Sequence, residues 1–132
     1  MVRVMIIDDE DEMKSLLKDF IQETGIETDS AGNAFDALRE LARRPFDLII
    51  TDIQMPGLTG LDILPRIREL QPGAYIIVMT AFGSEEVHRK SVERGATAYL
   101  EKPLSFEVLR KLVQEMASSK EREEAREISS GG

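Results

Sequence analysis

Short runs of apolar, β-forming residues alternate along the chain with segments whose apolar residues recur at helical spacing. Four runs are clear and a fifth is weaker: residues 2–7, 46–50, 75–79 and 98–100, with 26–30 the weaker one. These runs lack the apolar/polar alternation of a half-exposed strand. They are typical of strands buried on both faces in a parallel sheet covered by helices.

Helical patterns occupy the intervals between the runs. The expected helices cover residues 13–25, 33–45, 61–67, 84–95 and 105–117. Asn33 and Ser84 are placed to cap the second and fourth helices, and Gly25 is a natural end for the first. Pro65 falls inside the third pattern, so we expect either a kink or a late helix start there.

Strict alternation of five strands and five helices predicts an open α/β sheet with right-handed crossovers. In such sheets the functional site lies beyond the carboxyl ends of the strands. Beyond Ala117 the apolar pattern gives way to a charged stretch. We expect one domain over residues 1–117, followed at 118–132 by a charged helix extension or linker with a flexible end.

Composition removes several classes of function. The 132 residues carry a net charge of -8, which argues against a nucleic-acid or anionic membrane surface. The absence of cysteine and the single histidine, His88, exclude disulfides, thiolate catalysis, Cys- or His-rich zinc sites and histidine triads. The longest apolar run is far shorter than a membrane span, and no signal peptide is visible, so a cytoplasmic location is expected.

Charged and polar residues follow the predicted strands. Asp8 and Asp9 follow the first, Asp52 the third, Thr80 the fourth and Lys102 the fifth. Crowded carboxylates need protons or a counter-cation, and an all-oxygen ligand set suits Mg²⁺. A carboxylate can also act as a nucleophile and form an aspartyl phosphate, whose oxygens a cation, an ammonium and a hydroxyl would neutralise.

Four motifs carry a family resemblance, each at a predicted strand end: residues 6–10 (IIDDE), 48–57 (LIITDIQMPG), 77–81 (IVMTA) and 98–103 (AYLEKP). Over residues 2–117 the chain resembles a response regulator receiver domain of bacterial two-component signalling. The resemblance implies a flavodoxin-like, doubly wound five-stranded parallel sheet of order 2-1-3-4-5 with five helices.

The resemblance also implies the chemistry of the site. Asp52 would accept a phosphoryl group from a sensor histidine kinase. Asp8, Asp9, Asp52 and the backbone carbonyl of Gln54 would hold Mg²⁺. The only chemistry expected is self-phosphorylation and self-dephosphorylation, without turnover as an enzyme.

The remaining implied roles concern the switch. Thr80 and Lys102 would sense the phosphoryl group, and Tyr99 would be an aromatic switch that turns inward when Thr80 moves. The Lys102–Pro103 peptide is expected to be cis, as is usual in the family. The fourth helix, fifth strand and fifth helix would form the output face, through which the active form would form a homodimer.

Taken singly, these residues also have ordinary interpretations. Asp8 and Asp9 could belong to a solvated acidic helix start, and Asp52 could be a turn residue. Thr80 and Lys102 could be a plain strand-end threonine and a surface lysine. Tyr99 could be a half-buried tyrosine with its hydroxyl in water, and His88 is expected to be solvated or to pack rather than to catalyse.

Two other classes of function remain as alternatives. A phosphatase of the haloacid dehalogenase group would need a second aspartate where Gln54 stands, and would carry a substrate-capping insertion. A scaffold that kept the fold without phosphorylation is the other alternative. The charged tail also resembles the start of a linker to an output domain of the ATPase-type transcription activators, and no DNA-binding segment is present in these residues.

Gln54 lies two residues beyond Asp52 and Phe82 two residues beyond Thr80, and these side chains would flank the path of an attacking water to the phosphoryl group. Because Phe82 is bulky and apolar, we expect partial exclusion of water and slow self-dephosphorylation. Replacement by alanine would then accelerate phosphate loss.

Overall fold

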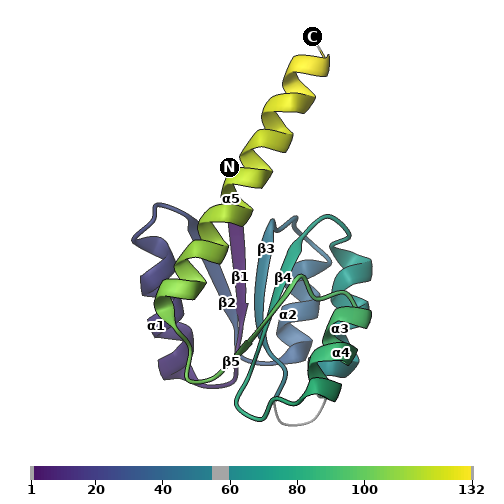
Figure 1. Ribbon diagram of the computed structural model, residues 1–132. Helices are drawn as coiled ribbons and strands as arrows, with labels where there is room; N and C mark the ends of the chain where they lie inside the picture. The colour runs from purple at the N-terminus through teal and green to yellow at the C-terminus, as the bar shows by residue number, and fades with distance from the viewer. Residues whose placement is uncertain (1, 55–59, 132) are drawn as a thin grey trace.

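The computed structural model describes residues 2–54 and 60–131, with side chains described through residue 126. Five parallel strands form one sheet of order β2-β1-β3-β4-β5, which is the predicted order (Figure 1). The strands are β1 (Arg3–Ile7), β2 (Glu27–Ala31), β3 (Leu48–Asp52), β4 (Tyr75–Thr80) and β5 (Ala98–Glu101).

Helices cover both faces of the sheet and enclose two apolar cores (Figure 1). One face is covered by α1 (Asp11–Gln22) and α5 (Phe106–Gly131). The other is covered by α2 (Ala34–Leu41), α3 (Gly60–Leu70) and α4 (Glu85–Glu93). The central strand β3 is buried along its whole length, whereas the edge strand β2 mixes exposed, half-buried and buried residues. This difference explains why β2 was the weakest strand pattern in the sequence.

Two helix starts follow their sequence signals. The Asn33 side chain accepts a hydrogen bond from the Asp36 amide, and the Ser84 hydroxyl accepts one from the Val87 amide. Each bond satisfies an amide that has no partner within its helix. Gly25 has a φ of 82°, a left-handed conformation that favours glycine, and it lies just beyond the end of α1.

The prediction of a late start for the third helix is wrong, because α3 begins at Gly60 and runs through Pro65. Proline has no amide hydrogen to donate to the carbonyl four residues earlier, which is that of Leu61. The guanidinium of Arg94 supplies the missing donor, with Nη1 2.9 Å from the Leu61 oxygen. A tertiary hydrogen bond therefore compensates for the proline within the helix.

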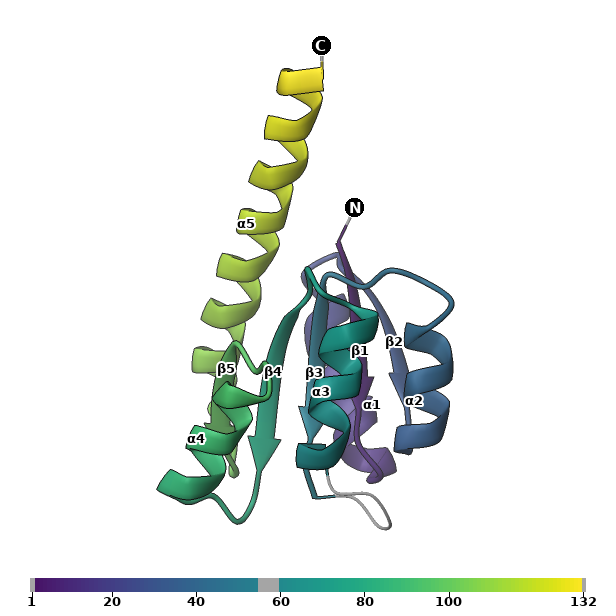
Figure 2. The same ribbon diagram turned by 90° about the vertical axis from the view of Figure 1, so that its right-hand side faces the viewer.

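The last helix, α5, continues through the charged tail as far as Gly131. Its C-terminal part projects beyond the amino ends of the strands (Figure 2). Lys120 anchors the extension, because its ammonium donates to the Gly73 carbonyl and lies 5.2 Å from the centre of the Tyr75 ring. Over the described residues, no helix is long and apolar enough to cross a membrane.

Candidate functional site

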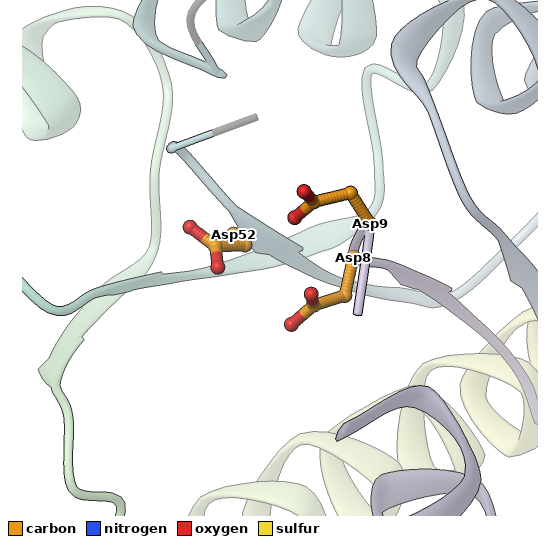
Figure 3. Close-up of side chains that lie close together, drawn as sticks. All are labelled: Asp8, Asp9 and Asp52. Carbon is orange, nitrogen blue, oxygen red and sulfur yellow. The ribbon is translucent and has the colours of Figure 1, made fainter. Parts of the chain in front are cut away.

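Three carboxylates meet at the carboxyl ends of the two central strands (Figure 3). Asp8 and Asp9 directly follow β1, and Asp52 is the last residue of the adjacent strand β3. One carboxylate oxygen from each residue lies within 4.8 Å of the other two. Asp8 and Asp52 are buried, whereas Asp9 is exposed. The parallel pairing of the strands thus brings together residues that lie 43 or more positions apart in the sequence.

The Lys102 ammonium group faces this cluster. The Lys102 Nζ donates to Asp52 Oδ2 at 2.7 Å and lies 3.6 Å from Asp8 Oδ2. The Lys102 backbone amide donates to the Thr80 carbonyl at 2.8 Å, which extends the pairing of β4 with β5 and aims the side chain at the cluster. The Lys102–Pro103 peptide is cis, as expected.

The charges are only partly balanced. Burial is the largest influence on Asp8 and, with the negative charges of Asp52 and Glu10, raises its pKa. The Glu10 amide, which donates to Asp8 Oδ1 at 2.9 Å, and the Lys102 charge oppose that rise. Burial alone would lower the pKa of Lys102, but its hydrogen bond to Asp52 and the surrounding carboxylates outweigh burial, and the pKa is raised.

The donor set fits a hard divalent cation. Asp8 Oδ2 is buried and has no hydrogen-bond partner within the described part of the chain, so a ligand oxygen is already desolvated and without a donor. The three nearby groups are carboxylates, the ligands that Mg²⁺ and Ca²⁺ prefer. Asp52 Oδ1 accepts a hydrogen bond from the Gln54 amide at 2.7 Å, whereas the role of the Gln54 carbonyl stays a prediction.

The Thr80 side chain is buried at the end of β4, the strand next to Asp52 in the sheet. Its Oγ1 accepts a hydrogen bond from the Phe82 amide at 3.1 Å and still carries one hydrogen to donate. Phe82 itself is 78% exposed. A side chain this exposed does not bury the site, so the structure does not support the expected shield against water.

The Gln54 side chain, expected to flank the path of an attacking water, makes a contact that the sequence does not predict. Its Oε1 accepts a hydrogen bond from the Ala81 amide at 3.1 Å and so joins the end of β3 to the loop after β4. The only signal in the sequence is the position of Gln54 two residues after Asp52, which does not reveal the direction of the side chain.

Tyr99 lies beneath the loop that leads into α4. Its ring stacks on that of His88, with the centroids 4.5 Å apart and an interplanar angle of 6°. Its hydroxyl is buried next to the Ser84 backbone and takes the space that a Cβ at Gly83 would need. Burial, followed by the charge of Glu101, raises the pKa of Tyr99. His88 therefore packs, and the aromatic pair links β5 to α4.

Comparison with known proteins identifies relatives over most of the chain. The family model for the response regulator receiver domain matches residues 4–114. The response regulator protein PilR of Pseudomonas aeruginosa is 35% identical over 84% of this chain. The DNA-binding transcriptional regulator NtrC of Azospirillum brasilense is 36% identical over 88% of it. The chain spans only about a quarter of the length of each of these two proteins. Sporulation initiation phosphotransferase F of Bacillus subtilis is 30% identical over 85% of this chain and is matched over 90% of its own length.

Solved structures agree with the fold. A response regulator from Burkholderia pseudomallei, described with a phosphorylated aspartic acid, a calcium ion and citrate, has a TM-score of 0.82 and 29% identity. The match covers 96% of this chain and 75% of that one. The beryllofluoride-activated receiver domain dimer of NtrC4 has a TM-score of 0.83 and 31% identity, covering 88% of this chain and 96% of that one. The chain therefore belongs to the response regulator receiver domains of two-component signalling.

Proposed function

We propose that this chain is a phosphorylation-activated switch in which Asp52 accepts a phosphoryl group from a sensor histidine kinase. One observation carries the proposal: the Asp52 carboxylate ends a buried central strand, 2.7 Å from the Lys102 ammonium and beside two further carboxylates. In the reaction an Asp52 oxygen attacks phosphorus, the bond from phosphorus to the histidine nitrogen breaks, and the imidazole leaves with the electron pair.

Asp8, Asp9 and Asp52 would hold a divalent cation, which we propose is Mg²⁺, with the Gln54 carbonyl as a further ligand. The buried Asp8 oxygen without a hydrogen-bond donor supports this, as does the calcium ion described for the Burkholderia relative. When bound, the cation would neutralise charge on the phosphoryl oxygens. Lys102 would balance a second oxygen, and the Thr80 hydroxyl would donate to a third.

Phosphorylation replaces one carboxylate with a group that carries more charge and more acceptor oxygens. Lys102 and Thr80 would be drawn toward it, and the loop after β4 would follow Thr80 because the Phe82 amide is bonded to its hydroxyl. Tyr99 packs beneath this loop and against His88 of α4. The response would therefore reach the surface formed by α4, β5 and α5, as a shift between two populated conformations.

The proposed partners follow from this surface and from the relatives. The partner upstream is a sensor histidine kinase. The partner downstream would be an output domain, which we propose is of the ATPase-type transcription activators. PilR and NtrC, a DNA-binding transcriptional regulator, are each about four times longer than the match and so carry further chain. Residues 1–117 would form the receiver domain and 118–132 the connection. A homodimer is proposed by analogy with the NtrC4 receiver, and the location is proposed to be cytoplasmic.

Incubation with acetyl phosphate and Mg²⁺, followed by intact-protein mass spectrometry, tests the proposal. We expect one added phosphoryl group that is stable in acid and labile in base, and that is lost in Asp52→Ala. The exposed Asp19→Ala is the matched control and should be phosphorylated like the parent. Continuous release of phosphate with no accumulated adduct would indicate a phosphatase, and neither adduct nor turnover would indicate a scaffold.

A further inference from the structure

Gln54 connects the phosphoacceptor to the loop expected to respond to it. Its backbone amide donates to Asp52 Oδ1 at 2.7 Å, and its side-chain Oε1 accepts from the Ala81 amide at 3.1 Å. Both residues are exposed, so water or an anion can compete for this second hydrogen bond. One residue thus bonds the carboxylate through its main chain and the first residue after β4 through its side chain.

The donors around Asp52 are already engaged in this structure. The Lys102 ammonium and the Gln54 amide donate to the two Asp52 oxygens, and the Phe82 amide donates to the Thr80 hydroxyl. The Ala81 amide differs from these, because its acceptor is an exposed side chain that can rotate away without disturbing a strand. A phosphoryl group on Asp52 brings three oxygens that need donors, and a charged oxygen is a stronger acceptor than a neutral amide oxygen.

We propose that the Gln54 side-chain amide is a resting-state occupant of a phosphoryl-oxygen site, holding the Ala81 amide until an anion on Asp52 displaces it. Gln54 is then a positioning residue that opposes activation. This inference rests on the proposed function, because it assumes that a tetrahedral anion binds at Asp52.

The expected effect is small and has a defined sign. The hydrogen bond from the Ala81 amide to Gln54 Oε1 joins two neutral, exposed groups, and water can replace it in part. Its net contribution to the stability of the resting state therefore lies at the low end of the range for hydrogen bonds. Removing the competing acceptor should therefore favour the anion-bound state by about two- to fivefold. Substitutions at Gln54 leave the main-chain amide and carbonyl in place, so only the side-chain contact is changed.

Beryllium fluoride, which forms a tetrahedral adduct on a carboxylate oxygen, is the probe. The full chain is titrated with it in saturating Mg²⁺, and the Ala81 amide is followed by two-dimensional ¹H–¹⁵N NMR. Gln54→Met has a similar length but lacks the acceptor, and Gln54→Asn keeps the amide but is too short to reach. Gln114→Met makes the same chemical change at an exposed position on α5 and is the matched control.

We expect half-saturation at about two- to fivefold less beryllium fluoride in Gln54→Met and Gln54→Asn, and no change in Gln114→Met. In the metal-free protein, the Ala81 amide proton should shift upfield and exchange faster with solvent in both Gln54 variants. A purely structural role for Gln54 would weaken binding of the probe instead.

Two results would overturn the inference while leaving the proposed function intact. One is parental half-saturation in both Gln54 variants, and the other is an Ala81 amide that is unchanged by either substitution. If the parent protein itself binds no beryllium fluoride in the presence of Mg²⁺, both the inference and the proposed function fail.

Discussion

Asp8→Asn should make the metal-free protein more stable, although it removes a residue from the proposed metal site. The Asp8 side chain is fully buried, and its Oδ2 has no hydrogen-bond donor among the described residues. Asparagine keeps nearly the same shape and can still accept the Glu10 amide hydrogen, which is now bonded to Asp8 Oδ1. The substitution therefore removes a charge while changing little else.

The magnitude follows from opposing terms around Asp8. At an effective dielectric constant of about 20, the attraction of Lys102 at 3.6 Å amounts to about 5 kcal/mol. The repulsion of Asp52, with ligand oxygens within 4.8 Å, offsets at least about 3 kcal/mol of it. The remaining terms are the Glu10 amide, which favours the charged form, and burial, which opposes it and is the largest influence on this carboxyl. Since the pKa of Asp8 is raised, the net effect opposes the charge, and we expect Asp8→Asn to stabilise the fold. About 1 kcal/mol, the usual size of the effect of a single substitution, is the expected scale.

The pH dependence has a defined sign. Because the pKa of Asp8 is higher in the folded than in the unfolded chain, the folded state binds the proton more tightly. The cost of the charge is absent below the unfolded pKa of about 4 and develops as the pH rises through the folded value. The difference between variant and parent should thus be near zero in acid, should grow as the pH rises above the unfolded pKa, and should be complete above the folded pKa.

Thermal unfolding followed by circular dichroism, with EDTA or with excess Mg²⁺, measures both effects. At pH 7 in EDTA the Tm of Asp8→Asn should exceed that of the parent by about 3–5 °C. Excess Mg²⁺ should reverse the order, because a cation that binds only the folded parent stabilises it by about 3 kcal/mol at a hundredfold excess over Kd. The exposed Asp19→Asn should change stability by less than about 0.5 kcal/mol. An Asp8→Asn protein that melts below the parent in EDTA at pH 7 would refute the reasoning.

Three further predictions concern neighbouring features. Lys102→Met should lower the free energy of unfolding in EDTA by about 3 kcal/mol, because the buried carboxylates of Asp8 and Asp52 lose the ammonium group that pairs with them. Urea titrations in which Mg²⁺ restores none of this loss would contradict the prediction. Arg94→Met should cost about 1 kcal/mol by removing the donor to the Leu61 carbonyl, and should cost less when Pro65→Ala restores a backbone amide there. An equal cost in both backgrounds of this double-mutant cycle would exclude the compensation. Phe82→Ala should change the rate of phosphate loss by less than about twofold, since the side chain is exposed, and a larger acceleration would restore the shield hypothesis.

The sequence predicted the fold because each buried strand and each helix carries its own local signal. The apolar run before Asp52, the caps at Asn33 and Ser84, and the glycine after α1 all act through nearby atoms. The third helix was predicted less well. Its continuity through Pro65 depends on a donor from Arg94, 33 positions away from the carbonyl it satisfies, and no local pattern reports such a contact.

The residues that gather around Asp52 were also predictable, because the carboxyl ends of parallel strands meet at one edge of a sheet. The sequence by itself determined which groups reach that edge: the carboxylates after β1 and β3 and the lysine after β5. Only the tertiary structure decided how far each group is desolvated, that the Gln54 side chain bonds the Ala81 amide, and that Phe82 is exposed. The physical reason is that periodicity and capping are local, whereas burial, charge balance and side-chain direction depend on segments that folding brings together.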